Sequence, residues 1–268
     1  MPIVALTREY GSGGTGISKK VAEALGYEYI RDEITKEAAE VFGVAEDELI
    51  AVVESKPGFW ESLAEAAQVE FATVAAEVMH IAERDNVVIM GRWATLLLRK
   101  VTHCVRVRVC APIDTRITRV MARRSVSRDK ATELIRKADE GAGARTRQFF
   151  GETRGDPLLY DMVLNTARLT SESAVHQIVQ LVRRPECQAT EASRARIRDL
   201  SLQARIRAIL KTTRETMRLD INVEAANGDV TLKGVVFAAP LKDQVEEIAK
   251  GVAGVRSVKN ELRIYREW

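Results

Sequence analysis

Eight consecutive residues near the start of the chain have the types and spacing needed to hold a phosphate group. They are Gly11, Ser12, Gly13, Gly14, Thr15, Gly16, Ile17 and Ser18. Glycines let the backbone turn tightly and direct its N–H groups at phosphate oxygens, and a following helix adds the positive end of its dipole. The spacing matches the phosphate-binding pattern GxxxxGK followed by Ser or Thr, with the Ser18 hydroxyl placed to meet Mg²⁺. The alternative is a glycine-rich turn that packs a helix on a sheet.

One position departs from this pattern, because Ile17 stands where the lysine is expected. That lysine normally meets the β- and γ-phosphates, so its charge must come from elsewhere. The nearest candidates are Arg8, Lys19 and Lys20, although Lys19 and Lys20 also suit a solvated helix face.

A basic segment in the middle of the chain suits the same kind of ligand. Residues 116–147 contain ten Lys and Arg against four Asp and Glu, a balance of +6. Four of its arginines recur at spacings of three and four residues, so several share a helix face: Arg116, Arg119, Arg123 and Arg124. Such a cluster fits a polyanion such as a nucleotide, whereas a charge run by itself more often marks a solvated helix. The whole chain carries only +3, so no nucleic-acid partner is expected.

The glycine-rich segment lies between elements that can position it. Ile3–Thr7 is a short apolar run, and apolar residues recur at helical spacing from Ile17 to Leu25, before Gly26. Further short apolar runs occur at 27–30, 87–90, 105–109 and 162–164, and helical segments at 59–83, 114–150 and 171–182 separate them. Short buried strands that alternate with helices predict an α/β fold, with a parallel sheet and helices on both faces.

The pattern changes after residue 182. Residues 183–198 are polar and charged, which predicts a linker. A helix is predicted at 200–210, a β-hairpin around the turn pair Asn227-Gly228, a second helix from Leu241 and a last strand at 258–264. The order αββαβ predicts a small α+β C-terminal domain. The expected boundaries are 1–182 for the first domain, 183–198 for the linker and 199–268 for the second domain.

Cysteine content and hydropathy limit the class of protein. Cys104, Cys110 and Cys187 are too few and too scattered for a disulfide framework, and they form no CxxC pair for zinc. The first residues lack the pattern of a signal peptide, and no run of about 18 apolar residues predicts a membrane span. We therefore expect a cytoplasmic protein that is not transmembrane.

Several short motifs together resemble a known family. The opening motif reads Thr7-Arg8-Glu9-Tyr10-Gly11-Ser12-Gly13-Gly14, and the later ones read Gly91-Arg92, Ala111-Pro112 with Arg116 and Arg119, and Tyr160-Asp161 with Asn165-Thr166. They resemble the cytidylate kinase-like family, a branch of the P-loop nucleoside monophosphate kinases, over about residues 1–182. In that branch the loop commonly lacks the lysine, so Ile17 agrees with membership. The resemblance implies a P-loop kinase-type sheet, ATP as phosphoryl donor and Mg²⁺ as cofactor.

This resemblance also implies roles for individual residues. The backbone of Gly11–Gly16 would hold the donor triphosphate, and Ser18 would bind the Mg²⁺ that bridges its β- and γ-phosphates. Arg92 follows a predicted strand and is expected at the acceptor phosphate, since a guanidinium meets phosphate bidentately. Asp32 would orient the acceptor nucleoside. The alternatives are a helix N-cap for Asp32 and a merely exposed side chain for Arg92.

The basic segment resembles a region of monophosphate kinases that leads into a lid, which closes over the phosphates and excludes water. Asp139 resembles an acidic lid position and is expected to help bind substrate. The family's arginine three residues later is replaced by Ala142, with Arg145 among the nearest replacements. The expected catalytic residues are Arg8, Arg92, Arg116, Arg119 and Arg145.

The C-terminal part resembles a BON domain over about residues 199–266. The motifs that carry this resemblance are Gly228–Val235, Val252–Val255 and Val258–Asn260. The resemblance implies a protein or lipid partner for this part of the chain.

Two main functions remain open from the sequence. The first is a nucleoside monophosphate kinase that uses ATP and a pyrimidine nucleoside monophosphate, CMP or dCMP. The second is a catalytically weak or inactive nucleotide-binding sensor or scaffold that acts through the BON-like domain. The glycine-rich loop, Ser18 and Arg92 favour the kinase, and Ala142 favours the sensor. A membrane-associated module is a third hypothesis.

Overall fold

The computed structural model of the protein describes residues 2–31, 33–42, 64–91 and 93–265. They belong to two compact units, each assembled from two separate stretches of sequence. The first unit contains Met1–Arg31 and Arg84–Thr190, and the second contains Asp32–Glu83 and Glu191–Trp268. Among the described residues, no helix combines the length and the hydrophobicity needed to cross a membrane.

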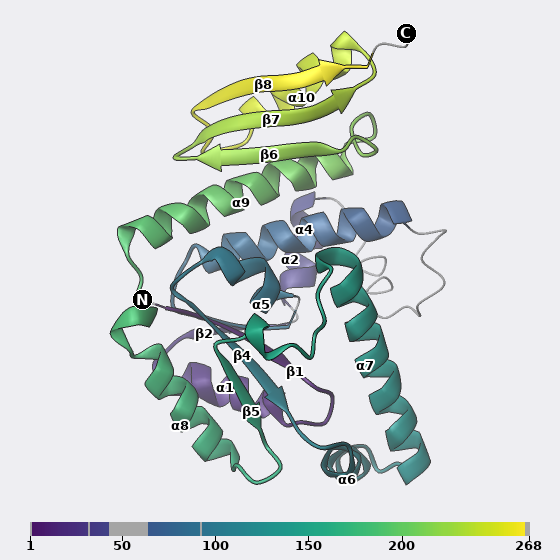
Figure 1. Cartoon of the computed structure of the whole chain (residues 1–268), viewed down its shortest axis with the longest axis vertical. Helices are drawn as coiled ribbons and strands as arrows, with labels where there is room; N and C mark the ends of the chain where they lie inside the picture. Colours follow the sequence, from purple (N-terminus) through teal and green to yellow (C-terminus); the bar gives the residue numbers. More distant parts are fainter. Residues whose placement is uncertain (1, 32, 43–63, 92, 266–268) are drawn as a thin grey trace. The chain divides into compact units, whose positions relative to one another are not determined.

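The first unit is built on a five-stranded parallel sheet (Figure 1). Its strands are β1 (Ile3–Arg8), β2 (Glu28–Ile30), β3 (Val87–Met90), β4 (Cys104–Cys110) and β5 (Met162–Asn165). Their order is β2-β3-β1-β4-β5, so β1 is central and pairs with β3 and β4. The chain places β2 and β3 on one side of β1, and β4 and β5 on the other. The carboxyl end of β1 is therefore a topological switch point, where open α/β sheets bind ligands.

Helices flank this sheet, as the sequence predicts. They are α1 (Gly14–Leu25), α5 (Ala94–Leu97), α6 (Ile113–Arg124), α7 (Arg128–Phe150) and α8 (Ser171–Val182), with short 3-10 helices η2 (Leu98–Lys100), η3 (Pro157–Leu159) and η4 (Pro185–Cys187). α1 packs beside α8, and both contribute to one hydrophobic core with the strands. That core includes Leu6 and Val107 from the strands and Ile17 and Ile178 from the helices, and each of these side chains is at most 2% exposed. The core thus fixes the first helix against the strand that precedes the glycine-rich segment.

The predicted helical region 114–150 is two helices, α6 and α7. Ser125 ends α6 in the left-handed region, with φ of 53°. Ser127 then begins α7 as its N-cap, and its side chain accepts a hydrogen bond from the Lys130 N–H at 3.3 Å. The break arises from local capping that residue composition alone did not reveal.

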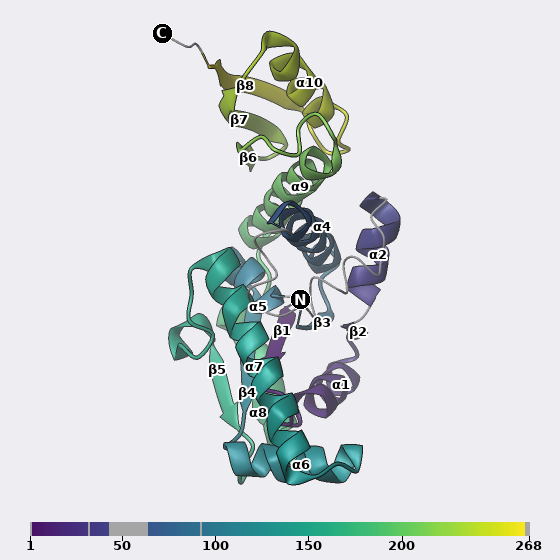
Figure 2. The ribbon, with the colours of Figure 1, turned by 90° about the vertical axis from the view of Figure 1, so that its right-hand side faces the viewer.

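The second unit contains a three-stranded sheet and four described helices. The helices are α2 (Glu33–Phe42), α4 (Ala64–Ala82), α9 (Glu191–Thr212) and α10 (Ala239–Lys250), and the strands are β6 (Ile221–Ala226), β7 (Asp229–Val236) and β8 (Ser257–Ile264). β6 and β7 form the predicted antiparallel hairpin, and β8 pairs parallel to β7. From α9 onward the order is αββαβ, which confirms the predicted α+β unit. Figure 2 shows α10 lying along its sheet, with which it shares a hydrophobic core.

Part of the segment predicted as a linker is helical. Residues 191–198 form the first turns of α9. α9 lies against α4 within the second unit, and Ser193 and Ile197 near its start are 5% and 1% exposed. Because tertiary packing rather than composition supplies most helix stability, a polar sequence is helical here. The domain boundaries themselves stay a prediction.

Candidate functional site

The glycine-rich segment forms the connection between β1 and α1 in the first unit. Gly11 and Gly13 both have φ of 85°, a left-handed conformation that glycine adopts without strain. Gly13 is the N-cap of α1, and no side chain caps the helix there. Among the described residues, no acceptor takes a hydrogen bond from the backbone N–H of Gly11, Gly13, Gly14 or Thr15. The segment therefore offers free donors at the positive end of a helix, as an anion site requires.

Two glycines in this segment differ in the room that the protein leaves for a side chain. A Cβ at Gly14 would lie 2.7 Å from Arg8 Cβ and 3.2 Å from Val109 Cβ, so the fold itself requires glycine there. A Cβ at Gly16 would meet nothing within 4 Å among the described atoms, and Gly16 is exposed. Glycine is unfavourable inside a helix, and no neighbour accounts for Gly16. The open space beside Gly16 is suited to a bound ligand.

Ile17 and Ser18 are both buried near the start of α1. Ile17 is 2% exposed and belongs to the hydrophobic core, so a charged side chain at this position would be costly. The Ser18 hydroxyl donates to the Thr15 carbonyl at 3.0 Å and lies 3.5 Å from the Tyr29 hydroxyl. Its predicted role as a Mg²⁺ ligand stays a prediction.

Arg8 lies directly against the glycine-rich segment. Its Nε donates to Thr15 Oγ1 at 2.8 Å. Burial lowers the pKa of the Arg8 guanidinium. The charges of Arg31, Arg154 and Arg123 lower the pKa of Arg8 further. Several guanidinium groups thus gather beside the segment and repel one another, which favours the binding of an anion.

Lys19 and Lys20, the other candidates for the missing charge, lie on the solvent side of α1. Both are exposed, and Lys20 Nζ pairs with Glu172 Oε1 at 2.7 Å. Lys19 Nζ lies 5.8 Å from the centre of the Tyr29 ring. Of the three candidates, Arg8 is therefore the one that contacts the segment.

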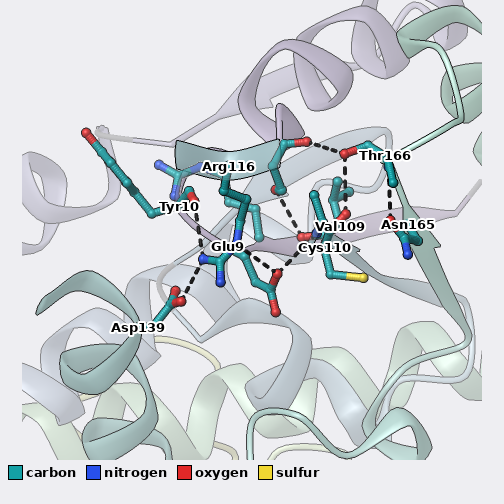
Figure 3. Close-up of polar contacts among 12 residues, drawn as sticks. Glu9, Tyr10, Val109, Cys110, Arg116, Asp139, Asn165 and Thr166 are labelled. Atoms are coloured by element: carbon teal, nitrogen blue, oxygen red, sulfur yellow. Dashed lines mark hydrogen bonds and ion pairs between the residues drawn. The ribbon is translucent and has the colours of Figure 1, made fainter. Parts of the chain in front are cut away.

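Arg116 is held by two carboxylates (Figure 3). Its Nη1 donates to Asp139 Oδ2 at 2.6 Å, and its Nε lies 3.6 Å from Glu9 Oε2. Glu9 also pairs with Arg108 at 2.8 Å and accepts from the Ala111 N–H at 3.1 Å. Arg116 is 8% exposed, so this network joins α6 and α7 to the end of β1. The predicted lid residue Asp139 and Arg116 are thus brought together by direct pairing.

Arg119 forms hydrogen bonds to Ser12 in the glycine-rich segment and to Thr166. Its Nη1 donates to Thr166 Oγ1 at 2.9 Å and to the Ser12 carbonyl at 3.3 Å, and its Nη2 donates to the Thr166 carbonyl at 2.7 Å. Thr166 Oγ1 in turn donates to the Ser12 carbonyl at 2.7 Å, one of the contacts around Thr166 in Figure 3. The Ser12 hydroxyl donates to the Val109 carbonyl at 3.1 Å. These hydrogen bonds hold the turn at Ser12 in place. Arg119 therefore helps to position the loop.

We expect Thr166→Val to destabilise the protein by about 1–2 kcal/mol, since the buried Ser12 carbonyl loses its shortest hydrogen bond while side-chain shape is kept. Urea unfolding measures the change. Thr118→Val is the matched control, because Thr118 is exposed and its hydroxyl donates to the Asp114 carbonyl within α6 at 3.0 Å. The control should change stability by less than about 0.5 kcal/mol. Equal effects of the two variants would show that Thr166 does not anchor the loop.

Three further predicted site residues are not shown in contact with the glycine-rich segment. Arg145 lies in α7, where its guanidinium is 3.3 Å from the Cβ position of Gly141. Arg92 and Asp32 lie outside the described residues. The structure therefore brings Arg8, Arg116, Arg119 and Asp139 around the loop, while the roles predicted for all these residues stay predictions.

Sequence reasoning assigned no role to three residues at the end of β1. Glu9 and Arg108 form the ion pair described above, and Arg154 donates from Nη2 to the Arg8 carbonyl and to Thr7 Oγ1. Glu9 could have been found, because it directly follows a strand that leads into the glycine-rich segment. Arg154 lies in the loop between α7 and η3, and no periodicity or motif spacing marks it.

Comparisons with known proteins find a matching family model for each part of the chain and relatives of the first part. The model of the cytidylate kinase-like family matches residues 3–168, and the BON domain model matches residues 198–265. A cytidylate kinase of Ignicoccus hospitalis is 26% identical over 186 residues, covering 68% of this chain and 99% of that protein. A cytidylate kinase of Thermoplasma acidophilum is 23% identical over 167 residues, covering 61% of this chain and 82% of that protein.

Among solved structures, one with a similar fold covers as large a share of this chain as the Ignicoccus hospitalis protein does. It is an uncharacterized protein from Eubacterium ventriosum, with a TM-score of 0.52 and 22% sequence identity. The match covers 68% of this chain and 98% of that chain. At this identity the likeness concerns the fold alone.

Proposed function

The chain belongs to the cytidylate kinase-like family, and from this membership we propose that it transfers the γ-phosphate of ATP to a pyrimidine nucleoside monophosphate. CMP and dCMP are the proposed acceptors, and the products are the nucleoside diphosphate and ADP. The glycine-rich segment carries the proposal, because it combines free backbone donors with open space beside Gly16 at the start of α1.

Phosphoryl transfer depends on holding the reacting groups in line and offsetting the charge of the moving phosphate. In the proposed reaction the backbone N–H groups of Gly11, Gly13, Gly14 and Thr15 bind the donor phosphates. Arg8 adds a guanidinium beside them, at the residue that ends β1. Arg119 and Arg116 hold the loop and α7 in place through their bonds to the protein. Arg92, by the family resemblance, is proposed to bind the acceptor phosphate.

The residues around the loop fit a Mg²⁺ ion that takes most of its ligands from substrate and water. Among the described residues, no group of three His, Cys, Asp or Glu side chains could hold a metal. The Ser18 hydroxyl, near the start of α1, is the proposed protein ligand. Mg²⁺ in kinase sites usually keeps several waters and binds the phosphates, which it neutralises. A single hydroxyl from this chain is sufficient for such a site.

The sensor or scaffold remains the second candidate, and Ala142 is the observation that favours it. Ala142 lies on α7, one turn beyond Asp139, where the family has an arginine. Without that charge the lid would offset less of the negative charge that moves between the phosphates. A protein of this kind would bind nucleotide and release it unchanged.

A coupled assay with ATP, Mg²⁺ and a panel of nucleoside monophosphates tests the proposal. We expect ADP release to be fastest with CMP or dCMP, and Arg92→Ala to abolish it. ATP binding in the absence of turnover with any acceptor would favour the sensor. A wild-type protein that binds no nucleoside triphosphate would contradict both functions.

For the C-terminal part, which matches the BON domain, the proposal is a protein or lipid partner. Phe237 and Tyr265 are 72% and 56% exposed, and their rings meet edge to face at 6.2 Å. Such a pair offers apolar surface for a partner to cover. Sedimentation of the full chain with anionic phospholipid vesicles tests the lipid alternative. Location in the cytoplasm stays a prediction.

A further inference from the structure

Arg154 reaches the same strand end as the glycine-rich segment, although no sequence motif contains it. Its Nη2 donates to the Arg8 carbonyl and lies 3.4 Å from Thr7 Oγ1. Its own carbonyl accepts from Arg108 Nη1 and from the Tyr160 hydroxyl, the latter at 2.9 Å. Both the backbone and the side chain of Arg154 are therefore held in place, so little conformational entropy would be lost on binding a ligand.

Around Arg154, arginine side chains outnumber the carboxylates that could pair with them, which favours the binding of an anion. The nearby carboxylate of Glu9 pairs with Arg108, and Glu9 and Asp139 both pair with Arg116. Within the described part of the chain, no carboxylate forms an ion pair with Arg8, Arg123 or Arg154. Burial lowers the pKa of Arg154 and the charge of Arg108 lowers it further, and the smaller opposing effects of Tyr160, Asp139 and Glu9 leave it lowered. Of these three, Arg8 and Arg154 are partly buried, and a partly buried guanidinium group without a carboxylate is unfavourable in the absence of a compensating anion.

Both arginines at this strand end keep unused donors. A guanidinium has five N–H groups in a planar fork that matches phosphate oxygens. Arg154 bonds through Nη2 and Arg8 through Nε, and among the described residues no acceptor takes a hydrogen bond from the other side-chain nitrogens of either residue. The position of the usual lysine is unavailable, because Ile17 there belongs to the hydrophobic core.

We propose that Arg154 is a phosphate-binding catalytic residue that supplies, together with Arg8, the positive charge that the loop lacks at Ile17. The inference rests on the proposed function and extends it to a residue outside the motifs. Arg154 binds the oxygens of the triphosphate and offsets their charge, while its bond to the Arg8 carbonyl holds it beside the loop.

Calorimetric titration of the full chain with ATP and with inorganic triphosphate tests this role. Arg154→Gln should weaken both affinities by about 10- to 100-fold, the range expected for lost hydrogen bonds to a charged group. The matched control is Arg136→Gln, since Arg136 carries the same charge on the exposed face of α7 and pairs with Glu140. The control should stay within about 2-fold of the wild type, because exposed pairs contribute little.

The outcomes separate this role from the proposed function. If the wild type binds ATP and the folded Arg154→Gln variant binds it equally well, the role of Arg154 is overturned and the function stands. If the wild type binds neither ligand, both are overturned. Should the variant fail to fold, a crystal structure of the wild type with a non-hydrolysable ATP analogue decides. Phosphate oxygens within hydrogen-bonding distance of the Arg154 guanidinium support the role, and their absence overturns it.

Discussion

Gly16→Ala should weaken ATP binding by about 100-fold while leaving the fold intact, because the added methyl group would occupy the space proposed for a phosphate. The protein offers no steric reason for this loss, since a Cβ at Gly16 meets nothing within 4 Å among the described atoms. The free energy of unfolding should stay unchanged or rise by up to about 1 kcal/mol, as alanine favours a helix more than glycine does. Titration calorimetry and urea unfolding measure the two effects.

Gly143→Ala is the matched control for this experiment. Gly143 also lies within a helix, α7, and the nearest atom to its Cβ position is the flexible Arg147 Nη1 at 3.7 Å. We expect it to gain similar stability and to keep the ATP affinity of the wild type. If Gly16→Ala bound ATP as tightly as Gly143→Ala does, the space beside Gly16 would not be the phosphate site.

Arg116→Met should destabilise the protein by about 2–3 kcal/mol, because it leaves the Asp139 carboxylate without its ion-pair partner, while Glu9 keeps its pair with Arg108. The estimate is below the value for fully buried pairs, since the Asp139 side chain is 31% exposed. Adding Asp139→Asn should recover part of the loss, because it removes the carboxylate charge that has lost its partner. Urea unfolding of the two single variants and of the double variant gives the coupling energy.

Arg124→Met provides the control on the same helix, since Arg124 is exposed at the end of α6. Its free energy of unfolding should change by less than about 0.5 kcal/mol. A different role for Arg116 would give a different pattern. If Arg116 contacted phosphate instead of holding α7, Arg116→Met would fold with wild-type stability and lose only nucleotide affinity.

The sequence predicted the elements around the loop because their signals are local. The apolar run 3–7 and the helical spacing from Ile17 to Leu25 correspond to β1 and α1, and Val87–Met90 is β3 without change. The same helical spacing already placed Ile17 on the apolar face, where the structure has it in the core. Strand, turn and helix follow from neighbouring residues, so the position of the glycine-rich segment could be predicted.

Contacts between distant parts of the sequence could not be predicted in this way. The helical start of α9 depends on packing against α4, and the environment of Arg116 depends on Glu9 and Asp139, which lie on other elements. Arg154 reaches the end of β1 from a loop 146 residues later in the chain. Such contacts arise only when the fold brings the elements together, so composition and spacing do not predict them.

The most direct test of the central claim follows the backbone amides of the loop by NMR. Uniformly ¹⁵N-labelled protein is titrated with Mg²⁺ and a non-hydrolysable ATP analogue. If the loop holds the phosphates, the amide resonances of Gly11, Gly13, Gly14 and Thr15 should show large shifts that saturate with the same affinity as calorimetry gives. Saturating binding that leaves these four resonances in place would contradict the claim.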